Sequence, residues 1–336
     1  DTGATGGILA TEEQDRVEDV RVDLINQNGT VMQTFVTSDD GAYHFINPLL
    51  TYTIDPLRDD NHKNGVSTLD LVRIQKHLLG LEAFDTPYKY IAADANNSES
   101  VSAIDLIEIR KLILGVTLEF PNNESWRFVD ADFTFQDETH PWPFDEVIEL
   151  MGGLSMSNDF VAVKVGDVNG TVTANAQQVQ TRNANGVLRL ETAEQQVTAG
   201  QEVVVKVRST NFDGIYGHQY TLLTEGLKIQ GVESGVLEMG AENIGIHKGS
   251  VTASWHTIQP VAVSSEDVLY TLKFVATQSG QLSEMLSMSS RVTEAEAYDS
   301  NEGILDVALV ILSLPSGQAG EGDAVSAVEE YALYQN

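Results

Sequence analysis

The sequence predicts a mainly β protein with two β-sandwich domains and a small pair of helices inserted in the first. Three observations lead to this prediction. Segments that alternate apolar and polar residues occur on both sides of residues 56–120, helical periodicity is confined to that stretch, and the stretch contains one loop-and-helix unit twice. The 336 residues leave room for two or three domains, each with its own core.

Residues 1–55 are typical of short strands separated by turns. Asn28-Gly29 and Asp40-Gly41 are turn signals of β-hairpins, and alternating segments flank both. The run TSDDGAYHF at residues 37–45 resembles the recurring hairpin of Ig-like or transthyretin-like repeats in bacterial surface proteins. The strands expected here cover residues 17–25, 30–37, 43–46 and 51–55.

The first sandwich needs further strands from beyond the helical stretch. The strands of residues 1–55 alone would leave an open sheet edge, which invites aggregation. Residues 125–135 and 159–165 alternate apolar and polar side chains and would complete the sandwich. We therefore predict an Ig-like sandwich over residues 1–170 with the helical stretch of residues 56–120 inserted in it. Three consecutive domains are the alternative.

Residues 59–80 and 94–115 repeat one unit, in which a polar loop of 12 residues leads into a helix. Asp, Asn, Val, Ser and a closing Asp recur in register through the two loops, and the helices of residues 71–80 and 106–115 end at Gly80 and Gly115. The repeat resembles the dockerin module, a pair of half EF-hands that docks onto a cohesin domain. The matching apolar stripes of the helices are Leu69, Val72, Leu78 and Leu79, and Ile104, Ile107, Ile113 and Leu114.

The loops of residues 94–105 and 59–70 are candidate calcium sites. Ca²⁺ takes six to eight oxygen ligands, and a 12-residue loop offers them at positions 1, 3, 5, 7, 9 and 12. Glu99 stands where such loops normally have Gly, and Lys63 cannot act as a ligand at position 5 of the first loop. The alternative is an Asx-rich turn that caps a helix without metal. The second loop offers Asp94, Asn96, Ser98, the carbonyl of Ser100, Ser102 and Asp105, and the first offers Asp59, Asn61, Ser67 and Asp70.

The resemblance to dockerins also implies which residues face a partner. These lie at the start and near the middle of each helix: Thr68, Gln75 and Lys76, then Ala103, Arg110 and Lys111. Residues 56–115 hold seven Lys or Arg and nine Asp or Glu, a net charge of −2 in a chain whose net charge is −31. A basic helix face on so acidic a protein favours pairing with an acidic surface. Ordinary solvated helix charge is the alternative.

The rest of the chain is expected to form a linker, a second sandwich and a tail. Residues 171–184 are polar and without periodicity, which predicts a linker. Residues 185–313 contain a succession of strands and no helical pattern, and the segments 197–207, 215–222 and 267–274 resemble strands of cohesin domains. Residues 314–336 end in YALYQN, which resembles the start of the sorting domain of type IX secretion cargo in Bacteroidota. We expect that the remainder of that sorting domain has been removed.

Composition and the absence of known motifs disfavour several classes of function. The net charge of −31 disfavours nucleic acid and anionic membranes as partners. Cysteine is absent, and no apolar run is long enough to span a membrane. The chain has no His-Glu-x-x-His, Gly-x-Ser-x-Gly or phosphate-loop motif, so we predict that it is not an enzyme, although counting carboxylates does not exclude a glycosidase pair.

Together these features predict a secreted structural protein, located outside the cell or on its outer surface. A dockerin-like and a cohesin-like part in one chain would let copies bind head to tail, and such a contact generates a filament when it does not close. The partner would then be another copy, or a separate protein that carries a cohesin or a dockerin. The alternative is a scaffold or adhesin component of a polysaccharide-degrading surface system that binds a separate partner or a glycan.

Overall fold

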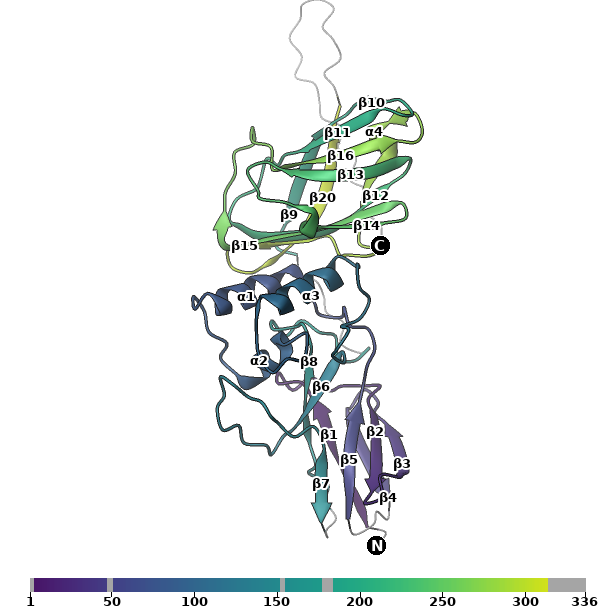
Figure 1. Ribbon diagram of the computed structural model, residues 1–336, viewed down its shortest axis with the longest axis vertical. Helices are drawn as coiled ribbons and strands as arrows, with labels where there is room; N and C mark the ends of the chain where they lie inside the picture. Colours follow the sequence, from purple (N-terminus) through teal and green to yellow (C-terminus); the bar gives the residue numbers. More distant parts are fainter. Residues whose placement is uncertain (1–2, 47–50, 152–154, 177–183, 314–336) are drawn as a thin grey trace, which may run out of the picture. The chain divides into compact units, whose positions relative to one another are not determined.

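The computed structural model describes residues 3–46, 51–151, 155–176 and 184–313 (Figure 1). The chain forms two compact units: unit 1 is Asp1–Leu112 with Thr117–Thr181, and unit 2 is Ile113–Val116 with Arg182–Asn336. Most elements in both are strands, which confirms the mainly β class. The tail of residues 314–336 lies outside the described residues, as does the segment 177–183. No helix within the described residues has the length and apolar character needed to cross a membrane.

Unit 1 contains two four-stranded sheets, and strands from both sides of the helical stretch join each of them. The orders are β4-β1-β8-β6 and β3-β2-β5-β7. Strand β8 pairs in parallel with β1, and β7 pairs antiparallel with β5, as the insertion hypothesis requires. The strands are β1 (Ala4–Ala10), β2 (Arg21–Asn26), β3 (Val31–Val36), β4 (Ala42–Ile46), β5 (Thr51–Leu57), β6 (Trp126–Asp130), β7 (Ile148–Met151) and β8 (Phe160–Lys164).

The core of unit 1 lies between these sheets. Strand β5 alternates buried and partly exposed residues, so that Tyr52 and Ile54 point inward, and Trp126 of β6 is buried in the same cluster. Val172 and Ala174 also belong to this cluster. The linker predicted for residues 171–184 therefore begins too early, because Val172 and Ala174 are part of the core of unit 1.

Three helices separate β5 from β6. They are α1 (Thr68–Leu78), α2 (Pro87–Ala93) and α3 (Ala103–Ile113). The first and third begin three residues earlier than predicted, because Ser67 and Asp70 form a capping box and the last positions of each loop already belong to its helix. Gly80 and Gly115 follow the helix ends with φ of +67° and +68°, as expected for left-handed caps.

Unit 2 is a β-sandwich. A seven-stranded sheet has the path β14-β15-β12-β19-β20-β9 with β18 beside β12, and a second sheet has the order β11-β16-β13. Tyr220 and Trp255 from the larger sheet pack in one core with Val205 and Phe274 from the smaller sheet. The elements are β9 (Val187–Ala193), β10 (Gln196–Val197), β11 (Glu202–Val207), β12 (Ile215–Thr224), β13 (Leu227–Ser234), η1 (Ala241–Asn243), β14 (Ile244–His247), β15 (Ser250–Val261), β16 (Tyr270–Ala276), β17 (Gly280–Gln281), α4 (Leu282–Met285), β18 (Leu286–Ser289), β19 (Glu296–Asp299) and β20 (Ile304–Leu312).

Candidate calcium loop and partner-binding helices

The loop of residues 94–105 curls around the carboxylate of Asp94. This residue follows α2, and its Oδ1 and Oδ2 accept hydrogen bonds from the amides of Ser98 and Glu99, both at 2.8 Å. The sharp turn is made by Asn97 and Glu99, with φ of +56° and +60°. Glu99 thus adopts the left-handed conformation that Gly normally supplies at this position, at some backbone strain.

The closing carboxylate of the loop is equally well held. Asp105 lies in the first turn of α3, where its Oδ1 accepts from the Asn96 amide at 3.1 Å. Its Oδ2 accepts from the Ser102 amide at 2.8 Å and from the Ser102 hydroxyl at 3.0 Å. Asp94 and Asp105 are 2% and 0% exposed. Burial, followed by the charge of Asp105, raises the pKa of Asp94, while the amides of Ser98 and Glu99 oppose the rise.

The donor set of this loop fits a hard cation. Oδ1 of Asn96 is buried and has no hydrogen-bond partner among the described residues, an arrangement that normally costs free energy. The hydroxyl of Ser98 lies 3.3 Å from the Ser100 carbonyl. Two buried carboxylates with amide, hydroxyl and carbonyl oxygens are the ligands that Ca²⁺ prefers. Within the described ranges no three His, Cys, Asp or Glu residues cluster as a metal site, so a cation here would depend on these mixed oxygens.

The loop of residues 59–70 is arranged differently from the second. Oδ1 of Asp59 accepts from the Ser125 amide at 2.8 Å and lies 3.0 Å from Nε2 of His62, and 47% of its side chain is exposed. Ser67 caps α1, and Asn61 is exposed with φ of +37°. Burial lowers the pKa of Lys63 to about 8. The four ligands predicted for this loop, Asp59, Asn61, Ser67 and Asp70, therefore lack the arrangement of the second set.

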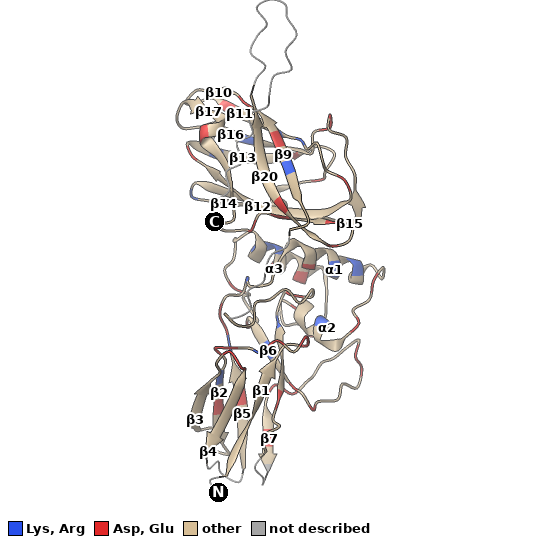
Figure 2. Cartoon of the chain, turned by 180° about the vertical axis from the view of Figure 1, so that it is seen from behind, with Lys and Arg blue, Asp and Glu red and all other residues tan. Residues whose placement is uncertain are grey.

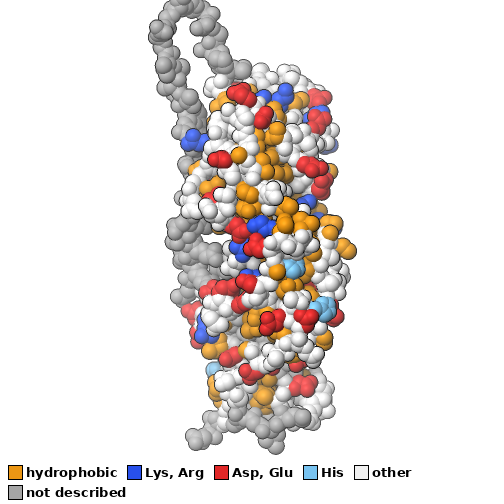
Figure 3. Space-filling view, turned by 90° about the vertical axis from the view of Figure 1, so that its left-hand side faces the viewer, with side chains coloured by type: hydrophobic (Ala, Val, Ile, Leu, Met, Phe, Trp, Pro, Cys, Tyr) orange, Lys and Arg blue, Asp and Glu red, His pale blue; other side chains and the backbone are white. Residues whose placement is uncertain are grey.

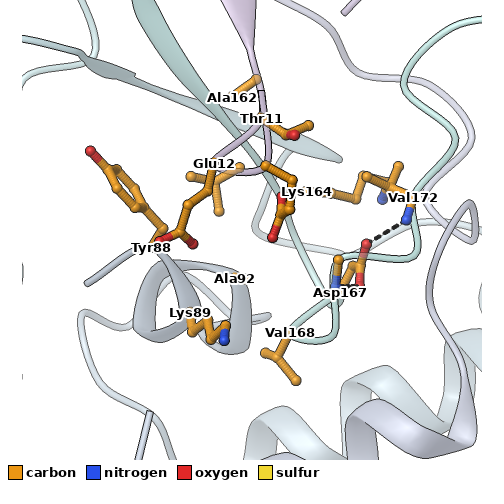
Figure 4. Close-up of a pocket in the computed structure, with 13 residues that line it drawn as sticks. Thr11, Glu12, Tyr88, Lys89, Ala92, Ala162, Lys164, Asp167, Val168 and Val172 are labelled. Carbon is orange, nitrogen blue, oxygen red and sulfur yellow. Dashed lines mark hydrogen bonds between the residues drawn. The ribbon is translucent and has the colours of Figure 1, made fainter. Parts of the chain in front are cut away.

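Asp70 instead binds a segment that follows β8. Its Oδ1 accepts from the amides of Val168 and Asn169 at 2.9 and 3.2 Å, while its Oδ2 accepts from Ser67. Nearby, the buried carboxylate of Asp167 accepts from the amides of Gly170 at 2.8 Å and Val172 at 2.7 Å, the bond drawn in Figure 4. Burial raises the pKa of both carboxyls, that of Asp167 to about 6. Asp70 thus ties α1 to the β8 end of the sandwich.

A small cavity lies beside Asp167. Figure 4 shows Lys164 of β8 and Glu12 among the side chains that line it. Its volume of about 40 Å³ leaves room for little more than water. Nζ of Lys164 donates to the His62 carbonyl at 2.7 Å, and burial lowers the pKa of this amine to about 7. These groups brace the helical stretch against the sandwich, a role that sequence analysis did not foresee.

The six residues implied as a partner-binding face lie on α1 and α3 at matching positions. Thr68 and Ala103 are the first residues of their helices, and Gln75, Lys76, Arg110 and Lys111 lie further along. Figure 2 shows Lys and Arg on both helices. Lys76 lies 3.5 Å from Glu82, and Lys111 lies 3.6 Å from Glu108. Thr68 and Lys76 are buried, at 0% and 8% exposed, so these two of the six predicted residues do not offer their side chains to a partner.

Exposed apolar side chains accompany these charges. Ile104 and Ile107, one turn apart on α3, are 56% and 51% exposed, and Leu78 and Leu79 at the end of α1 are exposed as well. The view in Figure 3 shows that hydrophobic side chains reach the protein surface among charged ones. A contiguous exposed apolar patch on a helix is typical of an interaction site. The apolar stripes marked this feature in the sequence, but they did not reveal which members are exposed.

Comparisons with known proteins identify similar solved structures. No protein-family model matches the chain, and neither does any curated protein sequence. A non-cellulosomal cohesin from the archaeon Archaeoglobus fulgidus has a TM-score of 0.26 and 16% identity, over 37% of this chain and 84% of the cohesin. The sixth cohesin of scaffoldin B from Acetivibrio cellulolyticus, solved in complex with a Cel5 dockerin mutant, has a TM-score of 0.28 and 19% identity, over 37% and 94%.

A third similar structure also comes from Acetivibrio cellulolyticus. It is a mutant of a type II cohesin–X–dockerin complex, with a TM-score of 0.29 and 14% identity, over 38% of this chain and 95% of the other. Each likeness thus spans nearly a whole cohesin-containing chain but little more than a third of this one.

Proposed function

We propose that this chain is a non-catalytic secreted assembly protein whose copies associate head to tail into an extracellular or cell-surface filament. The observation that carries the proposal is the exposed pair Ile104 and Ile107 on α3, next to the cationic positions Arg110 and Lys111. Because each side chain is only about half exposed, burial of the remainder in a contact would contribute roughly half of the 1.5–3 kcal/mol that a full burial gives.

Charge favours unit 2 of a neighbouring copy as the surface that receives this face. Residues 180–313 contain sixteen Asp or Glu and eight Lys or Arg. Opposite charges across a contact accelerate encounter and fix its orientation. Because the helices and the sandwich are unlike surfaces, each copy keeps one of each available, and the contact propagates without closing.

Calcium in the loop of residues 94–105 is the second part of the proposal. Ca²⁺ would neutralise Asp94 and Asp105, use the Oδ1 of Asn96, and so fix the start of α3 that carries Ile104. Extracellular modules often bind Ca²⁺ with a Kd of about 10⁻⁴–10⁻³ M, near its concentration outside cells. The chain has no cysteine, so no disulfide can fix this loop in place of a bound ion.

Sedimentation of the full chain with α3 altered tests this function. Changing Ile104 and Ile107 together to Asp places charge in the proposed contact, so the sedimenting species should shift from oligomers to monomers. Val36→Asp is the matched control, because Val36 is 56% exposed but lies on β3. Assembly that survives the double change, or that is equally lost in the control, contradicts the proposal.

A further inference from the structure

A polar hollow of about 340 Å³ opens on unit 1 beside the loop of residues 94–105. Its volume lies at the lower end of the range for small-molecule sites, but its lining is polar, whereas most such sites are lined by apolar side chains. Segments distant in the sequence meet here: the loop itself, the approach to β6, β6, and the approach to β7. The lining residues are Asn97, Asn122, Asn123, Glu124, Arg127 and Glu146.

The inner part of the hollow is fixed by Arg127. Its guanidinium donates to both carboxylate oxygens of Glu146, with Nε at 2.7 Å from Oε2. It also donates to Oδ1 of Asn97 at 2.7 Å and to Oδ1 of Asn123 at 3.3 Å. Nδ2 of Asn123 donates in turn to the carbonyl of Asp94 at 2.8 Å. This bonded network holds the floor in place before any ligand arrives, which lowers the ordering cost of binding.

The outer part has unused hydrogen-bonding capacity. The side-chain amide of Asn122, Nδ2 of Asn97 and the carboxylate of Glu124 have no hydrogen-bond partner among the residues that the structure describes. Together they offer donors and acceptors around one space. Partial burial, and then the charges of Asp59 and Glu146, raise the pKa of Glu124.

This lining selects one class of ligand. All six residues that line the hollow are polar, which disfavours lipids and apolar peptides. Two carboxylates against one guanidinium leave a formal charge of −1, which disfavours phosphates and acidic sugars. Arg127 at the floor opposes a metal cation. A neutral ligand that both donates and accepts hydrogen bonds remains, and we propose that the hollow binds one or two units of a neutral saccharide.

Saturation-transfer NMR on the full chain tests this site, whether or not copies self-associate. The probes are methyl glycosides of glucose, mannose, galactose and xylose, with cellobiose, xylobiose and chitobiose. We expect at least one to bind saturably, with a Kd of about 1 mM or tighter, which corresponds to about −4 kcal/mol. Galacturonate should bind at least tenfold more weakly than the best neutral probe. Saturation by none of the neutral probes, or equal binding of galacturonate, overturns the proposal.

Two variants tie the binding to this hollow. Glu124→Ala and Asn122→Ala remove exposed side chains, so both should fold as the wild type does. Each should weaken the best probe tenfold or more, because a hydrogen bond to the sugar is lost. Glu119→Ala is the matched control, since Glu119 is an exposed acid of the same connection that lies outside the lining. Unchanged affinity in both hollow variants, or an equal loss in the control, shows that the sugar binds elsewhere.

Discussion

The backbone amide of Asn96 donates a hydrogen bond of 3.1 Å to Oδ1 of Asp105. This bond joins the third position of the loop of residues 94–105 to the first turn of α3. The side-chain Oδ1 of the same Asn96 is buried without a partner among the described residues. One residue thus both closes the loop and offers it an unused ligand. This pairing is the reason that we propose calcium for this loop and not for the loop of residues 59–70.

Calcium binding should depend on Asp94 and Asp105. Changing both to Asn keeps their size but removes two negative charges, so added Ca²⁺ should no longer raise the melting temperature. For the wild type at a concentration about 100 times the Kd, binding contributes about 2.7 kcal/mol. Calorimetry with calcium or a chelator measures this. Asp59→Asn is the control, and calcium should still raise its melting temperature. If a chelator leaves the melting temperature of the wild type unchanged, the loop binds no calcium.

Unit 2 should lose stability in acid because of His218. This residue of β12 is buried among Tyr220, Trp255 and Tyr270, and neither ring nitrogen has a partner among the described residues. Burial lowers its pKa from 6.5 to about 3. Between pH 6.5 and pH 3, His218 is protonated in the unfolded chain but stays neutral in the folded chain. The free energy of unfolding therefore decreases as the pH drops from 6.5 towards 3, by up to about 1.4 kcal/mol per pH unit.

Replacing His218 by Phe removes this dependence. The ring stays aromatic and no longer buries unpaired nitrogens, so the variant should be more stable at pH 7 by about 1 kcal/mol or more. Urea unfolding at pH 7, 6, 5 and 4 should show a smaller loss on acidification than the wild type shows. If the free energy of unfolding falls equally with pH in both proteins, His218 is not the cause of the acid sensitivity.

The first sandwich should not fold without the strands that follow the helices. A fragment of residues 1–55 retains β1 and the first five residues of β5 but lacks β8 and β7, their partners. Its open edges and missing core residue Trp126 should leave it unfolded or aggregated. Circular dichroism and size-exclusion chromatography test this, and a monomeric fragment that melts cooperatively would disprove the insertion.

The charged positions on the helices should steer assembly. Reversing Arg110 and Lys111 to Glu should slow assembly and remove most of its sensitivity to salt, whereas Lys76 is buried and is left unchanged. Deleting residues 325–336 should leave assembly intact. Light scattering at several salt concentrations follows both. The opposite pattern, with loss in the deletion alone, would place the contact at the carboxy-terminal tail, where a terminal strand could add to an open sheet edge.

Local pattern predicted the features that depend on neighbours in sequence. The mainly β class followed from alternation, and periodicity predicted the helices of the repeat, although α1 begins three residues earlier because Ser67 and Asp70 cap it. The pairing of Asp70 with the amides of Val168 and Asn169 spans almost a hundred residues, and no local motif encodes it. Loop spacing marked Glu99 as standing where Gly normally turns the chain, but a non-glycine residue gives no signal that it adopts the left-handed conformation.

The apolar stripes of the helices show a second limit. Leu71, Ile74, Ile109 and Leu112 are buried, whereas Ile104 and Ile107 are exposed. Helices that are apolar on more than one side satisfy the same periodicity with either side inward, so the sequence alone does not choose. That choice depends on which strands and loops surround the helix.

Electron microscopy of the purified full chain in millimolar calcium tests the central claim most directly. Head-to-tail binding between the α1 and α3 face and a neighbouring sandwich predicts fibres of uniform width that lengthen with protein concentration, and that shorten to single particles in the Ile104→Asp, Ile107→Asp variant. Single particles of the wild type at every concentration, with or without calcium, would contradict the assembly function.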